Sequence, residues 1–147
     1  MTGSRRGSRG LTLQGLYQWL VNASDVDDIL AQIRDMDGFG KADQAYLKLL
    51  VQGVVFNADA LRERIRPYLD RPTKNLSPIE HALLLMAACE LSTQPETPYR
   101  VVINEAVELA KIYGGTDGHK YVNGVLDKLA AELRPDEIGS RKKKSVN

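Results

Sequence analysis

Residues 98–130 read PYRVVINEAVELAKIYGGTDGHKYVNGVLDKLA, and the spacing of their apolar side chains decides the fold class. At 100° per residue, apolar residues fall on one side of each half of this stretch. They are Val102, Ile103, Ala106, Leu109, Ala110 and Tyr113 in the first half, and Val122, Val125, Leu126, Leu129, Ala130 and Leu133 in and just beyond the second. Between the halves, the segment Gly114-Gly115-Thr116-Asp117-Gly118 supplies glycines that tolerate a positive φ. The pattern predicts two amphipathic helices joined as a hairpin.

The rest of the chain has the same helical periodicity and almost no strand signal. Further helices are expected near 8–22, 25–36, 42–56 and 57–69, and from Ser77 onward. Ser77, Pro78 and Glu80 mark the start of the last of these, as a cap, a first-turn proline and the acid of a capping box. The sequence therefore predicts an all-α bundle of about seven helices. We expect a flexible basic N-terminus at 1–7, one domain at 8–135 and a flexible basic tail at 136–147.

The composition is that of a single soluble domain. The chain has 147 residues, of which 43% are hydrophobic and 27% charged, enough to build a core without covalent staples. It contains no run of 18 apolar residues and no signal-peptide pattern, so we expect a cytoplasmic protein with no membrane partner. The lone Cys89 lies in the apolar segment LLLMAACEL and is expected to fill space in the core, with a nucleophile as the less favoured interpretation.

Charge is unevenly distributed, although the net charge is only +1. Arg5, Arg6 and Arg9 lead into the first helix with no acid among residues 1–20, and the tail carries RKKK at 141–144. A polyanion would therefore meet a local basic region and not a basic surface overall.

The sequence contains no catalytic constellation. Its two histidines, His81 and His119, belong to no metal-binding motif, and the glycine-rich loop follows a helix where a phosphate loop would follow a strand. The paired carboxylates Glu105 and Glu108 are expected to be solvated acids on a polar helix face. We therefore expect a protein that is not an enzyme and needs no cofactor or metal.

Two segments resemble one known family. The opening stretch is similar to the C-terminal signature of the NusB family, roughly PY-x-VAINEAVELAK-x-(Y/F)G…HK-(F/Y)-VNGVLDK, and RRGSRGLTLQGLYQW at 5–19 resembles its arginine-rich N-terminal motif. The resemblance implies the NusB fold, in which two small helical subdomains pack together. It also implies a transcription antitermination factor that binds boxA-type single-stranded RNA together with NusE, a small-subunit ribosomal protein. Such a factor keeps the RNA polymerase elongation complex, with other Nus factors, transcribing through ribosomal RNA operons.

Specific residues follow from the resemblance. The implied RNA contacts are Arg5, Arg6, Arg9, Gln14, Asp117, Lys120 and Tyr121, and the implied contacts to NusE are Tyr17 and Glu80. These residues also have structural alternatives. Asp117 can cap the last helix, Glu80 can serve the capping box, and the two tyrosines can pack on the core. Lys120 can be one more exposed helix lysine, and the arginines can belong to a solubilising tail. Because the arginines match phosphates and a tyrosine can stack on a base, we expect the leading segment and the last loop to form one joint cationic platform.

The chain departs from the family pattern at Gly7, Ser8, Gly10 and Leu85. The two glycines each cost a helix roughly 1 kcal/mol relative to alanine, so the basic end is expected to fray until RNA binds. Two other functions stay open. One is a NusB-like module related to those on ribosomal RNA cytosine methyltransferases, which need a further αβ catalytic domain with a glycine-rich cofactor loop that these 147 residues do not contain. The other is a helical protein–protein scaffold.

Overall fold

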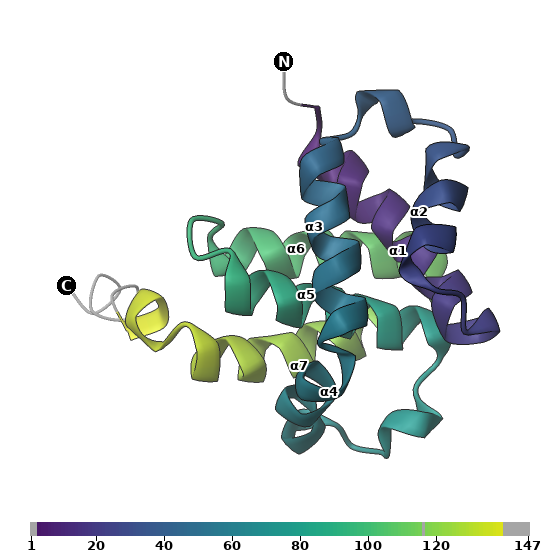
Figure 1. Ribbon diagram of the computed structural model, residues 1–147. Coiled ribbons are helices and arrows are strands. Elements are labelled where there is room, and N and C mark those ends of the chain that lie inside the picture. The colour runs from purple at the N-terminus through teal and green to yellow at the C-terminus, as the bar shows by residue number, and fades with distance from the viewer. Residues whose placement is uncertain (1–2, 116, 140–147) are drawn as a thin grey trace.

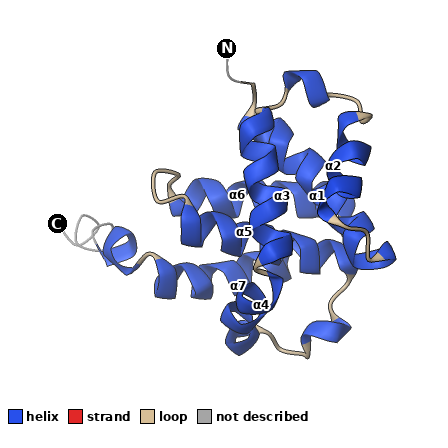
Figure 2. Ribbon diagram, in the orientation of Figure 1, coloured by secondary structure: helices blue, strands red, loops and turns tan. Residues whose placement is uncertain are grey.

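The computed structural model describes residues 3–115 and 117–139, and these residues form a helical bundle without strands (Figure 2). Three short 3₁₀ turns, η1 (Phe39–Lys41), η2 (Arg66–Tyr68) and η3 (Thr73–Asn75), lie in the connections. The α-helices are α1 (Arg5–Asn22), α2 (Val26–Arg34), α3 (Gln44–Phe56), α4 (Ala58–Ile65), α5 (Pro78–Thr93), α6 (Tyr99–Tyr113) and α7 (Gly118–Leu133). The all-α prediction is confirmed, and no described helix is both long and apolar enough to cross a bilayer.

Two apolar clusters correspond to two packed subdomains. The smaller cluster joins α1, α2 and α3 through residues such as Leu11, Ile29 and Leu47. The larger one surrounds α5, whose residues 82–91 are all buried. Figure 1 shows α5, α6 and α7 lying roughly side by side, with α1 and α3 crossing them. Helix α5 is therefore the central helix on which the other elements are arranged.

The start of α1 differs from the prediction. Ser4 caps the helix by accepting a hydrogen bond from the Gly7 amide, and its own amide donates to the Lys41 carbonyl at 2.8 Å. The hydroxyl of Ser8, which is fully buried, donates to the Asp43 carbonyl at 2.6 Å. The helix thus begins at Arg5, three residues early, and residues 3–7 pack against the η1–α3 connection, because these local bonds offset the low helix propensity of the glycines.

Gly15 sets the close approach of α1 and α2. A Cβ atom there would lie 2.6 Å from Ile33 Cδ1 and 2.9 Å from Ile29 Cγ2, and both isoleucines are fully buried. A side chain at this position would force these packed groups apart. The glycine that weakens the helix by propensity is therefore required by its packing.

Residue Arg134, just after α7, closes the end of α5. Its buried guanidinium donates to the carbonyls of Leu91, Gln94 and Thr97 at 2.9–3.0 Å. It thus supplies donors at the end of α5, where the last carbonyls of a helix lack partners within the helix. Residues 135–139 form a further helical turn, and Glu137 accepts a hydrogen bond from the Tyr99 amide. Residues 136–139 of the expected tail are thus packed on the body, whereas the RKKK run lies outside the described residues.

Candidate nucleic-acid interface

The structure removes Arg9 from the predicted RNA contacts. Its side chain is only 5% exposed, and Nε and Nη2 donate to the two carboxylate oxygens of Glu90 at 2.8 and 2.9 Å. Since α1 extends back to Arg5, Arg9 continues the apolar stripe of the helix and faces α5. A guanidinium paired in the interior cannot meet a phosphate at the surface, and Arg9 is a structural residue here.

Tyr46 on α3 completes this buried ion pair. Its hydroxyl donates to Glu90 Oε2 at 2.6 Å. Burial, followed by the hydrogen bond to the Glu90 carboxylate, raises the pKa of Tyr46 to about 12, because both disfavour a second negative charge at this place. The Arg9–Glu90–Tyr46 network thus links α1, α5 and α3 through one carboxylate.

Arg5 lies above this network and stays partly accessible. Its guanidinium carbon is 4.2 Å from the centroid of the Tyr46 ring, within cation–π range. Nε and Nη1 lie 3.8 Å from the carboxylates of Asp43 and Glu96. With 45% of its side chain exposed, Arg5 can still reach an anion.

Arg6 is the most accessible of the N-terminal arginines, with 78% of its side chain exposed. Nε lies 3.1 and 3.2 Å from the two carboxylate oxygens of Glu105, and Nη2 lies 3.1 Å from one of them. The Glu105 carboxylate faces α1 and is 14% exposed, so the expectation that Glu105 is a solvated acid is wrong. Because one edge of the guanidinium fork is held by Glu105, the other edge can bind a phosphate.

Gln14 extends this line along α1. Its amide nitrogen donates to the Tyr113 hydroxyl at 3.5 Å, eight residues after the Arg6–Glu105 contact on both helices. The two contacts follow in the same order along α1 and α6, so the seam between these helices leads from the arginines toward the C-terminal end of α6. Tyr113, expected on the buried stripe, is 43% exposed at the end of this seam.

The first turn of α7 presents Lys120 and Tyr121. Lys120 is exposed and lies 3.5 Å from the Asp117 carboxylate. Asp117 stands at the N-cap position of α7 but makes no side-chain cap bond, so its observed partner is Lys120. Tyr121 is half-buried, with its hydroxyl accepting a hydrogen bond from the Asp70 amide at 3.3 Å.

These two groups of residues do not form the compact joint platform that was expected. Arg9 lies at Glu90, whereas a Cβ at Gly118 would lie 3.7 Å from Glu80 Oε2. Glu80 and Glu90 are ten residues apart on α5, about 15 Å along its axis. The arginines and Lys120 thus mark opposite ends of an elongated surface, the α1–α6 seam, which consists of Arg5, Arg6, Gln14, Tyr113, Asp117, Lys120 and Tyr121.

The two predicted partner residues lie at the loop end of that seam. Glu80 forms the predicted capping box with Ser77 in both directions, and it still faces Gly118. Tyr17 is 36% exposed and follows Gln14 on the same face of α1. The structure therefore brings Glu80 and the start of α7 together, and it places the predicted partner surface next to one end of the seam.

Comparison with known proteins shows the family of this chain. The sequence model of the NusB family matches residues 6–131. The chain belongs to the NusB family. It is 55% identical over 144 residues to the transcription antitermination protein NusB of Paraburkholderia phytofirmans, covering 98% of this chain and all of that relative.

Solved NusB structures have the same fold. A crystal form of Thermotoga maritima NusB matches with a TM-score of 0.82 at 28% identity, over 95% of this chain and 99% of that one. A complex of the antitermination factors NusB and NusE with double-stranded RNA matches with a TM-score of 0.76 at 23% identity, over 87% and 96%. The expected NusB fold is confirmed.

One cation at the loop end of this NusB-family chain was missed by sequence reasoning. The Arg71 guanidinium carbon lies 4.5 Å from the centroid of the Tyr121 ring, and the same guanidinium contacts the Asp70 carboxylate at 2.6 and 3.1 Å. Arg71 is in the connection before η3, about fifty residues from Tyr121, so no helical periodicity relates the two. One face of Tyr121 is thus already covered by a cation.

His81, next to Glu80 on α5, is held neutral. Arg62 Nε on α4 donates to His81 Nε2 at 3.1 Å, and the Arg62 guanidinium lies 5.6 Å from the Trp19 ring. Burial, and then the charge of Arg62, lower the pKa of His81 to about 4. Protonation would remove the acceptor and place two cations in contact.

We expect the stability to fall as the pH is lowered from 6.5 toward 4. In this window the unfolded chain binds a proton at His81 that the folded chain does not, so the free energy of unfolding falls by up to about 3 kcal/mol. Urea unfolding followed by circular dichroism between pH 7 and 4.5 measures the effect. His81→Gln should remove most of this dependence, whereas His119→Gln should keep it; equal slopes in all three proteins would contradict the assignment.

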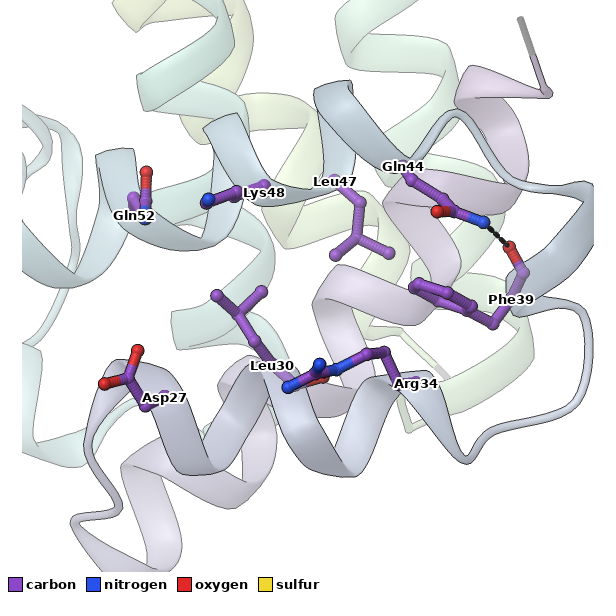
Figure 3. Close-up of a pocket in the computed structure, with 8 residues that line it drawn as sticks. All are labelled: Asp27, Leu30, Arg34, Phe39, Gln44, Leu47, Lys48 and Gln52. Atoms are coloured by element: carbon purple, nitrogen blue, oxygen red, sulfur yellow. Dashed lines mark hydrogen bonds between the residues drawn. The ribbon is translucent and has the colours of Figure 1, made fainter.

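One cavity lies apart from the predicted site residues. A cavity of about 400 Å³ opens between α2, η1 and α3, with Leu30, Leu47 and Phe39 in it and Arg34 and Lys48 at its rim (Figure 3). None of the predicted site residues lines it. Cys89 is buried as expected, and within the described ranges no three His, Cys, Asp or Glu side chains gather as a metal site.

Proposed function

We propose that this protein is a transcription antitermination factor that binds boxA-type single-stranded RNA together with NusE and promotes processive transcription of ribosomal RNA operons. The observation that carries the proposal is the full-length similarity to NusB proteins, with 55% identity over nearly the whole chain. Such a factor acts with the RNA polymerase elongation complex and other Nus factors, so its place is the cytoplasm. It makes and breaks no bond, in keeping with the absence of a catalytic constellation in the sequence.

The RNA surface is the α1–α6 seam. Arg5, Arg6 and Lys120 supply the cations, Gln14 supplies an amide, and Tyr121 supplies an aromatic edge. The Asp117 carboxylate lies 3.5 Å from the Lys120 ammonium group and competes with phosphate for it. Arg9 takes no part at the surface and holds α1 in place from below.

When RNA binds to this surface, its phosphates replace the carboxylates that now pair with the cations. Arg5, Arg6 and Lys120 are each within 4 Å of a carboxylate, and a phosphate must compete with those acids. Phosphate contacts therefore replace existing ion pairs, and the affinity for RNA alone is modest. NusE, bound at Tyr17 and Glu80 beside the loop end, raises the effective concentration of the RNA in a joint complex.

Fluorescence anisotropy with a labelled boxA RNA, with and without NusE, tests the proposal. With three cations on phosphates, the log–log slope of affinity against salt should be about −2, from about −0.7 per contact. NusE should strengthen binding. Retention of NusE without any salt-dependent RNA binding would overturn the proposal and favour a protein–protein scaffold.

A further inference from the structure

A second polar surface lies on the other side of α6, in a cleft of about 300 Å³ between α6 and α7. Arg100 and Asn104 line it from α6, and Asn123 and Asp127 line it from α7, with Tyr99 and Ile103 also contributing. No hydrogen bond or ion pair engages the side chains of Arg100, Asn104, Asn123 or Asp127 in the described part of the chain. Two carboxamides, a guanidinium and a carboxylate thus converge without partners.

The charged groups of this cleft differ in their pairing from those of the α1–α6 seam. There, each cation is already held by an acid, whereas here the charged groups stand on opposite walls and do not meet. Unpaired amides, a cation and an anion together present donors and acceptors that a mixed polar ligand can satisfy. The volume is at the lower end of the range for ligand pockets, about 300–1,000 Å³, which suits one nucleotide.

The cleft is continuous with the proposed RNA surface. Lys120, Asn123 and Asp127 are three and four residues apart on α7, so they share one stripe of the helix. An RNA strand that contacts Lys120 at the loop can follow this stripe directly into the cleft. A protein partner would be expected to need buried aromatic or aliphatic anchors, and the rim offers mainly polar groups.

Resting on the proposed function, we propose that this cleft is a nucleotide subsite of the RNA surface. Asn104 and Asn123 hydrogen-bond the edge of one unpaired base, as carboxamides do where they read bases. Arg100 binds a neighbouring phosphate. Asp127 accepts from an exocyclic amino group or a ribose hydroxyl and keeps phosphates on the Arg100 side. The subsite therefore prefers a base with an amino group over uracil.

The test uses the full chain with NusE and a labelled boxA RNA in which each position is changed in turn to uridine. Asn104→Ala and Asn123→Ala should each weaken RNA binding about tenfold and leave the salt slope unchanged, because no charge is lost. One RNA position should be sensitive in the wild type and insensitive in both variants. Gln52→Ala, an amide of the cavity between α2 and α3, is the matched control and should bind normally.

Arg100→Ala gives an independent measurement. It should reduce the magnitude of the salt slope by about 0.7, as expected for one lost phosphate contact. Arg64→Ala, which removes another exposed arginine with no ion partner in the described structure, should not. Asn123→Asp, which keeps the shape, tests the site again if an alanine variant proves unstable by circular dichroism.

The outcomes separate this subsite from the proposed function. Normal RNA affinity in the Asn104, Asn123 and Arg100 variants, with the wild type binding RNA, would overturn the subsite and leave the function standing. Loss of NusE binding with unchanged RNA affinity would make the cleft a protein contact and would also overturn it. A wild type that binds no RNA in the presence of NusE would overturn both.

Discussion

Glu90→Ala will lower the free energy of unfolding by about 3–5 kcal/mol, the largest loss of stability that we expect from a single substitution in this protein. The carboxylate is 1% exposed and accepts from both Arg9 and Tyr46. Its removal leaves a guanidinium charge in the interior without a partner, which is the costly way to break a buried ion pair. For a domain of this size the midpoint of thermal unfolding should fall on the order of 10 °C.

A double variant separates the charge from the packing. Arg9→Met with Glu90→Leu removes both charges and keeps apolar volume, and it should be much more stable than Glu90→Ala, because no unpaired charge remains. Tyr46→Phe should cost less than Glu90→Ala, since it removes one hydrogen bond and leaves the ion pair intact. Calorimetry of the three variants provides the comparison, and a double variant as unstable as Glu90→Ala would contradict this explanation.

Arg6→Ala combined with Lys120→Ala will weaken boxA RNA binding more than tenfold and reduce the magnitude of the salt slope by about 1.4, as two lost phosphate contacts require. Both side chains are at least 73% exposed, so the helical content and the thermal midpoint should stay near those of the wild type. Anisotropy over a range of salt concentrations, with NusE present, measures both quantities.

A matched control keeps the number of charges removed equal. Lys48→Ala with Arg64→Ala also removes two exposed cations, one on α3 and one on α4, away from the α1–α6 seam, and it should retain RNA affinity apart from a small long-range effect. Equal losses in the two double variants would mean that net charge decides binding and would reject the seam as the site. Arg9 is left out of this series because its removal would disturb the fold.

Prediction from sequence was correct for features that depend on residues within a single helix. Periodicity located the helices to within a few residues, and Ser77-Pro78-Ile79-Glu80 predicted the start of α5 with its capping box, because these signals act over three or four residues. The same local reasoning missed the start of α1. Ser8 and Ser4 stabilise that turn through the backbone at Lys41 and Asp43, a distant segment that no helical pattern reveals.

The candidate site, too, could be predicted from the sequence only in part. The sequence by itself determined the helical hairpin of α6 and α7, the family to which the chain belongs and the types of residue able to meet RNA. Only the tertiary structure decided which arginine faces solvent, since Arg6 and Arg9 lie three residues apart on one helix and differ in what packs over them. The contacts of Arg9 with Glu90, of Arg6 with Glu105 and of Arg71 with Tyr121 join residues 50 to 99 positions apart. Such pairs depend on how helices pack, and packing is a property of surfaces brought together by the whole fold.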